Sequence, residues 1–143
     1  MIGKIIFDRT MKSVEELDVF KLAHNLALEI YRVTSEFPKE ESFHLSMQMR
    51  RAASSVGMNL AEGSMRFNSR EYRQYVGIAR GSAAEVRYQL LLAKDLGYIS
   101  DDCFKDIRSA YNRVGQMLTR LGQSLNQEAR SQTRAPSRTR SRP

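Results

Sequence analysis

The sequence has no tryptophan, only one cysteine and three prolines, and no apolar run that approaches the length of a membrane span. The single cysteine, Cys103, excludes a disulfide within the chain and a multi-cysteine metal cluster. With no run of about 18 apolar residues and no signal-peptide core at the N-terminus, the chain is expected neither to cross a membrane nor to be exported. These absences predict a cytoplasmic protein whose 143 residues suffice for one ordinary domain.

Side chains that could support catalysis are few and poorly placed for it. His24 and His44 lack the spacing of a zinc-binding HExxH pair, and Ser54 follows two alanines inside a predicted helix instead of a strained elbow. Glu62 and Glu85 are not accompanied by the Glu-x-x-His motifs of di-metal bundles. Catalytic residues, metal ligands and cofactors are therefore not expected, and an enzyme with its active site in a bundle core is disfavoured.

Apolar residues recur at spacings of three and four in four segments, which is typical of amphipathic helices. The predicted helices span about residues 18–36, 42–62, 69–96 and 101–125. Pro38 ends the first helix, Ser42 is the predicted N-cap of the second, and Gly63 is its predicted C′ residue. Four helices with short connections predict an all-α fold, namely an antiparallel up-down four-helix bundle.

The two ends of the chain differ in composition from the predicted bundle. Residues 1–12 are expected to form an N-terminal arm, residues 13–125 the four-helix bundle, and residues 126–143 a basic tail. The tail consists mainly of Arg, Ser, Thr, Gln and Pro without apolar periodicity, so it is predicted to be disordered.

Positive charge is concentrated in the middle and at the end of the chain. The net charge is −4 over residues 13–41, with three basic and seven acidic residues, but +5 over residues 42–94, with eight basic and three acidic residues. Residues 126–143 add five arginines against one glutamate. Clustered positive charge favours nucleic acid as a partner, followed by an acidic protein.

The third predicted helix carries a stripe of basic residues. Arg66, Arg73, Arg80, Arg87 and Lys94 follow one another at steps of seven, so their side chains share one slowly drifting face that rises about 31 Å from Arg73 to Lys94. Such a stripe can meet successive phosphates of a nucleic-acid strand. The alternative is that these arginines flank the core and pair with acidic residues of the first helix. The predicted nucleic-acid-binding residues are Arg50, Arg51, Arg66, Arg70, Arg73, Arg80, Arg87, Lys94, Arg130, Arg134, Arg138, Arg140 and Arg142.

A second line of small and apolar residues follows the same helix beside its core face. It consists of Gly77, Gly81, Ala84, Tyr88 and Leu91. Small residues at these spacings let another backbone approach closely, so this line is a candidate interface between subunits of a homo-oligomer. The alternative is that the glycines only accommodate the neighbouring helix of the same chain.

On the second predicted helix, polar residues lie among apolar ones. Arg51, Asn59 and Glu62 are interpreted as buried side chains that satisfy one another and fix the register of the bundle.

Three segments, MRRAASSVGMNLAEGS, EYRQYVGIARGSAAEVRYQLLLAKDLGYI and LDVFKLAHNLALEIYRVTSEFPKEE, resemble the bacterial four-helix-bundle proteins encoded in intervening sequences of 23S rRNA genes. The resemblance covers about residues 12–125, and the motifs RRAxxSVxxNLAEG and ARGSxAE are specific in combination. Phe20 stands where the family typically has tryptophan, and the arginine-rich tail is longer than the family core requires. The same fold group includes Avd, the accessory protein of diversity-generating retroelements.

The resemblance implies a homopentameric barrel of four-helix bundles with a basic surface that binds RNA or DNA and without enzymatic activity. For Avd-type members it also implies binding to a reverse transcriptase and its template RNA. A protein-interaction scaffold that docks an acidic partner without contacting nucleic acid is the alternative that the basic residues leave open.

Overall fold

A computed structural model describes residues 13–134 of the chain, and all of its regular structure is helical within that range. The elements are the short 3₁₀ helix η1 (Val14–Glu16), α1 (Asp18–Thr34), the 3₁₀ helix η2 (Lys39–Glu41), α2 (Leu45–Ser64), α3 (Ser69–Asp95) and α4 (Asp101–Thr133). The predicted all-α fold with four long helices is thereby confirmed.

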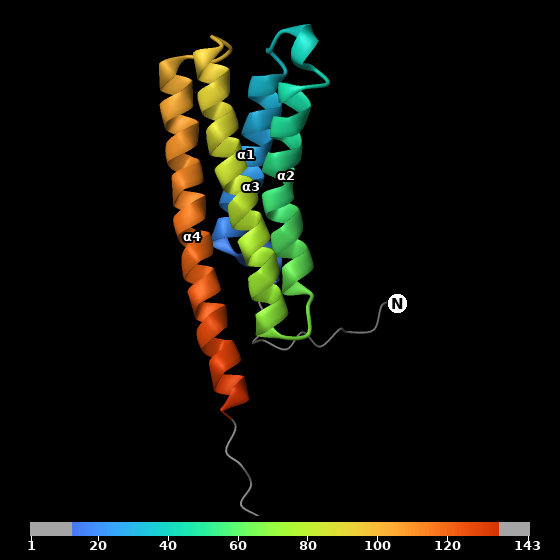
Figure 1. Ribbon diagram of the computed structural model, residues 1–143, viewed down its shortest axis with the longest axis vertical. Helices are drawn as coiled ribbons and strands as arrows, with labels where there is room; N and C mark the ends of the chain where they lie inside the picture. The colour runs from blue at the N-terminus through green and yellow to red at the C-terminus, as the bar shows by residue number, and fades with distance from the viewer. Residues whose placement is uncertain (1–12, 135–143) are drawn as a thin grey trace, which may run out of the picture.

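The four long helices stand side by side in an up-down arrangement (Figure 1). Each helix packs against the next in the chain, and α1 also contacts α4. At one end, the Tyr98 hydroxyl donates to Glu41 Oε1 at 3.0 Å, and the Tyr98 ring packs on Phe37 with centroids 5.2 Å apart. None of the helices within residues 13–134 is long and apolar enough to cross a bilayer.

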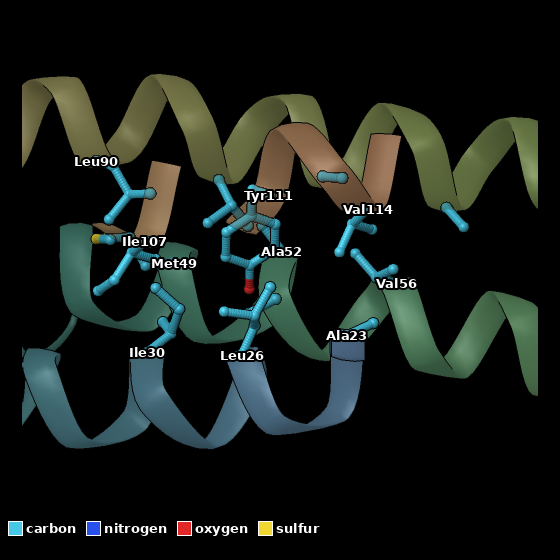
Figure 2. Close-up of a cluster of buried hydrophobic side chains, with 14 of the residues drawn as sticks. Ala23, Leu26, Ile30, Met49, Ala52, Val56, Leu90, Ile107, Tyr111 and Val114 are labelled. Carbon is cyan, nitrogen blue, oxygen red and sulfur yellow. The ribbon is translucent and has the colours of Figure 1, made fainter. Parts of the chain in front are cut away.

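All four helices contribute to one apolar core along the bundle axis (Figure 2). Its fully buried large side chains are Ile30, Met49, Val56, Leu60, Val86, Leu90, Tyr111, Val114 and Leu118. Among them Tyr111 is exceptional, because its ring extends from α4 toward α1 and its hydroxyl is buried without a hydrogen-bond partner among the described residues. Burial also raises the pKa of the Tyr111 phenol, since the charged form would lose its hydration.

The rotation of α3 about its axis is fixed by a seam of residues spaced alternately by three and four. The central members of this seam are all buried: Val76, Ala79, Ala83, Val86, Leu90 and Ala93. Asn68 caps the helix, since its side chain accepts a hydrogen bond from the backbone N–H of Glu71 at 2.8 Å. The end of α3 is closed at Gly97, whose φ of 79° lets the Tyr98 N–H donate to the Ala93 carbonyl at 2.9 Å.

The start of α2 differs from the prediction that Ser42 is its N-cap. Ser42 instead ends η2, and α2 begins at Leu45 after His44, whose side chain makes no capping bond. The free backbone N–H of Leu45 is satisfied by the Glu41 carboxylate at 3.2 Å. A carboxylate four residues earlier thus replaces the expected serine hydroxyl.

Gly63 is not the C′ residue of α2, because it lies inside the helix and is buried. A Cβ placed on Gly63 would come within 2.7 Å of Tyr75 Cβ and 3.0 Å of Tyr72 Cδ1. Glycine is therefore required at position 63 because α2 and α3 approach closely there. It is not required by a backbone conformation that other residues avoid.

The last helix is longer than predicted. It continues from Leu125 to Thr133, so residues 126–133 are helical and the prediction of a disordered tail from residue 126 is wrong for this part. Gln127, Glu128, Ala129 and Arg130 are all good helix formers, which favours extension of a helix already nucleated by the bundle. In Figure 1, α4 runs past the turn between α2 and α3. Residues 1–12 and 135–143, with Arg138, Arg140 and Arg142, lie outside the described range.

The predicted mutual network of Arg51, Asn59 and Glu62 does not form. The Asn59 amide donates to the Ser55 carbonyl at 2.8 Å and to its hydroxyl at 2.9 Å, and Ser82 of α3 donates to the same hydroxyl at 2.9 Å. Arg51 and Glu62 are exposed. The polar bridge between α2 and α3 is therefore made by serines and an amide, without buried charges.

Replacement of Gly63 by alanine is expected to destabilise the fold by about 1–3 kcal/mol, because the new methyl group must push apart two helix backbones. Gly115→Ala is the matched control, since a Cβ there meets nothing within 4 Å and the exchange improves helix propensity. Urea unfolding should show a lower stability for Gly63→Ala and an equal or higher one for Gly115→Ala. A Gly63→Ala variant as stable as the original chain would contradict the close approach.

Replacement of Tyr111 by phenylalanine removes a buried hydroxyl that has no partner. We expect the free energy of unfolding to rise by about 1–3 kcal/mol, which is the usual cost of an unsatisfied buried polar group. Tyr31→Phe, at a half-exposed position, should leave it unchanged within about 0.5 kcal/mol. A loss of stability in Tyr111→Phe would reveal a hydrogen-bond partner for the hydroxyl.

Candidate nucleic-acid interface

A groove follows the surface between α3 and α4. Its central part has a volume of about 610 Å³ and is lined by Arg80 and Arg87 of α3 and by Asn112, Gln116 and Thr119 of α4, together with small residues. Arg87 is held toward α4 because its Nη1 donates to Asn112 Oδ1 at 2.9 Å. The core seam of α3 faces inward, so the basic residues beside the seam point along this edge.

The groove continues at both ends of its central part. At one end a hollow of about 470 Å³ shares Gly77, Arg80 and Thr119 with the centre and adds Arg73. At the other end a hollow of about 210 Å³ shares Arg87 and adds Arg108 of α4. Three of the five members of the predicted stripe, Arg73, Arg80 and Arg87, therefore lie in one continuous groove.

The electrostatics of this groove are unbalanced. Among the described residues, no aspartate or glutamate lines any of its three parts. Within residues 13–134, the ion pairs are those of Arg32 with Glu29 and of Arg66 with Glu62. The alternative that the stripe arginines pair with acidic residues of the first helix is therefore wrong. Arg66 pairs with Glu62 of α2, and Arg73, Arg80 and Arg87 form no ion pair within residues 13–134.

The line of small residues predicted as an oligomer interface lies in the same groove. Gly77, Gly81 and Ala84 line its centre, and Tyr88 and Leu91 line the end with Arg108. A Cβ on Gly77 or Gly81 would meet nothing within 4 Å, so these glycines do not accommodate α4. Because they have no side chains, these glycines keep the groove open between the arginines. The basic stripe and the predicted oligomer interface therefore lie in the same groove.

Other predicted binding residues lie away from the groove. Arg50 points to the end of α1, where its Nε donates to Thr34 Oγ1 at 2.9 Å and its guanidinium stacks 4.9 Å from the centre of the Tyr31 ring. Arg51 lines a separate hollow between α2 and α3. These two positions are adjacent in sequence, but only Arg51 presents a free guanidinium to solvent.

The ends of the stripe are held by aromatic rings. Arg66 pairs with Glu62 at 2.9 Å and lies 4.6 Å from the centre of the Tyr75 ring. Lys94 Nζ lies 4.9 Å from the centre of the Phe104 ring, and Arg108 approaches the same ring at 5.4 Å. Arg70, at the start of α3, is exposed.

The α4 side of the groove was missed by reasoning from charge. Arg108 belongs to a segment of balanced charge, and the other lining residues of α4 are uncharged. Their spacing carried a signal, since Arg108, Asn112, Gln116, Thr119 and Gln123 recur at steps of three and four. Arg130 lies seven residues beyond Gln123 on the helical continuation of α4, so helical periodicity places it on nearly the same face.

The fold and this groove define a class of protein, an all-helical four-helix bundle with an uncompensated basic surface. The profile of the 23S rRNA-intervening sequence protein family matches residues 15–120, and the chain belongs to that family.

Among solved structures, the chain is similar to a protein of unknown function from the S23 ribosomal protein family of Bacteroides thetaiotaomicron. The two share 22% sequence identity with a TM-score of 0.68, over 73% of this chain and 95% of the other. At this identity the similarity concerns the fold. No curated protein matches the chain.

The placement of Arg50 predicts a structural role. Arg50→Ala should lower the free energy of unfolding by about 1–2 kcal/mol, because a charge-assisted hydrogen bond to Thr34 and the packing on Tyr31 are lost. Arg51→Ala is the neighbouring control and should change it by less than about 0.5 kcal/mol. Thermal unfolding of both variants measures the difference, and equal stabilities would contradict the assignment.

Proposed function

We propose that the protein is a non-enzymatic nucleic-acid-binding accessory protein that holds the phosphate backbone of RNA in the groove between α3 and α4. The observation that carries the proposal is the row of Arg73, Arg80 and Arg87 in one groove without any carboxylate. A phosphate backbone would supply the missing negative charge, and its binding would release counterions. DNA or an RNA–DNA hybrid offers the same chemistry.

The lining of the groove favours contacts to phosphate over contacts to bases. Guanidinium groups fit phosphates with two parallel hydrogen bonds, and the amides of Asn112 and Gln116 add neutral donors. Proteins that bind the bases of single strands use rows of aromatic rings. Among residues 13–134, Tyr88 is the single aromatic residue that lines the three parts of this groove. Binding is therefore expected to depend weakly on sequence.

Family membership supports assembly into a homo-oligomer, for which the resemblance implies a homopentamer. A ring would repeat the groove around one assembly and multiply weak phosphate contacts. In the Avd-type version of this function, the assembly serves a retroelement reverse transcriptase by holding its template RNA. In the alternative version, the assembly is a protein encoded in a ribosomal RNA intervening sequence, and RNA is its ligand without a reverse transcriptase.

A second candidate is a scaffold whose groove docks an acidic protein surface, because the same unpaired arginines would complement clustered carboxylates. A purified complex with such a partner would survive nuclease treatment. An assembly bridged by RNA would fall apart under the same treatment.

The charge-reversed variant Arg80→Glu/Arg87→Glu tests the proposed site. Its affinity for a 30-nucleotide RNA should fall roughly tenfold or more, and the slope of log K against log salt should become shallower by about two. Lys39→Glu/Arg113→Glu makes the same change in net charge outside the groove and should retain most of the affinity and slope. Fluorescence anisotropy between 50 and 300 mM salt measures both quantities.

An equal loss in both variants would mean that net charge, and not the groove, determines binding. No loss in Arg80→Glu/Arg87→Glu would exclude the groove as the RNA site. If RNA binding is absent from the original chain while an acidic protein partner binds in the groove, the scaffold is the correct function.

A further inference from the structure

The outer face of α3 carries a second seam, distinct from its buried one. Ile78, Gly81, Glu85, Tyr88 and Leu92 alternate by three and four, as the a and d positions of a coiled coil do. The side chains of Ile78, Tyr88 and Leu92 are exposed by 54%, 65% and 37% of their areas, and no helix within residues 13–134 covers them. An outward seam of this type fits a helical partner.

An apolar groove lies on another side of the bundle, between α1 and α2. It has a volume of about 380 Å³, and small residues form much of its lining, among them Ala27, Gly57 and Ala61. Leu28 and Met58, which also line it, are exposed by 57% and 63%. Small residues between larger ones are the usual arrangement where a ridge of side chains enters a groove between helices.

The dimensions of the two features agree. The lining of the groove extends along α1 from Phe20 to Tyr31, which is about 16 Å at 1.5 Å per residue. The outer seam extends from Ile78 to Leu92, about 21 Å. The outer seam is therefore long enough to lie along the full length of the groove.

We propose that the outer seam of α3 from one copy of the chain docks into the α1–α2 groove of a second copy. Since the two surfaces lie on different helices of one bundle, the contact is head-to-tail and leads to a ring or a filament. The contact specifies how the oligomer under "Proposed function" is built, and it is independent of whether RNA is the ligand of the arginine groove.

Charge favours this pairing over a contact between two seams. Glu85 occupies the middle of the seam, and two seams in contact would bring the Glu85 side chains of both copies together. Among the described residues, no carboxylate lines the α1–α2 groove, and Arg50 stacks on the ring of Tyr31, which is part of that lining. A single charged residue at such a position also fixes the register of the two helices.

The seam shares Gly81 and Tyr88 with the lining of the arginine groove, but Arg80 and Arg87 do not belong to the seam and stay outside this contact. A subunit seated between α3 and α4 would bury Arg80 and Arg87 where no residue of their own chain can neutralise them, which is costly. In the α1–α2 groove the contact buries mainly apolar area, as stable subunit interfaces do.

Two variants, each defective in one surface, test the proposal. Leu28→Glu/Met58→Glu disrupts the groove and Ile78→Glu/Leu92→Glu disrupts the seam, at residues exposed enough that the bundle should still fold, which circular dichroism checks. Each variant alone should be monomeric by sedimentation velocity. Their equimolar mixture should form a heterodimer and nothing larger, because one intact seam and one intact groove remain between them.

The matched control is Met65→Glu/Phe67→Glu, which removes two apolar residues exposed by 80% and 103% elsewhere on the surface and should assemble as the original chain does. The RNA-site variant Arg80→Glu/Arg87→Glu should also assemble normally. A loss of RNA binding without loss of assembly, or the reverse, therefore separates the two proposals.

Cross-linking tests the orientation. In a Cys103→Ser background, the double variant Leu28→Cys/Leu92→Cys should give a ladder of oxidised oligomers, whereas each single-cysteine variant should give none. A dimer formed by Leu28→Cys alone would show groove-to-groove contact and overturn the proposal. An original chain that is monomeric at 100 µM, or a mixture without heterodimer, would overturn it as well.

Discussion

The inward seam of α3 is the constraint on which the other surfaces of this protein depend. Its small and branched members, with Gly63 of α2 against Tyr72 and Tyr75, allow little rotation of α3 about its axis. Once that rotation is fixed, the arginines at seven-residue intervals must face the edge toward α4. The same rotation turns Ile78 and Leu92 outward, so packing in the core determines where charge and exposed apolar area appear.

The second determinant is the separation of charge between helices. Most acidic residues of the first forty positions lie on or beside α1, which is diagonal to α3 across the core. Glu29 of α1 is already paired with Arg32. Within residues 13–134 no carboxylate lines the groove between α3 and α4, and the proposed polyanionic ligand would supply the missing negative charge.

The three- and four-residue spacing of side chains correctly predicted the features of the fold that depend on local sequence. The four helices follow from spacings of apolar residues that act within a few positions. Arg73, Arg80 and Arg87 were placed on one face for the same reason, and they do share a groove.

Features that depend on contacts between helices could not be predicted in this way. Gly63 suggested a helix end in the sequence, but its role is set by two tyrosines of α3. Arg50 and Arg51 look equivalent in sequence, yet a rotation of 100° directs one to the end of α1 and the other to solvent. The α4 side of the groove is uncharged apart from Arg108, so charge does not mark it, and the three- and four-residue spacing of its polar residues gains meaning only when α4 is packed beside α3.

The most direct measurement of the central claim is site-specific photo-cross-linking to RNA. A benzophenone amino acid at Gln116, within the groove, and the same residue at Lys39, outside it, report which surface lies against the nucleic acid. We expect a covalent RNA adduct from position 116 that fails to form when irradiation is done at high salt, and little adduct from position 39. Adducts from position 39 alone, or equal adducts from both positions, would contradict it.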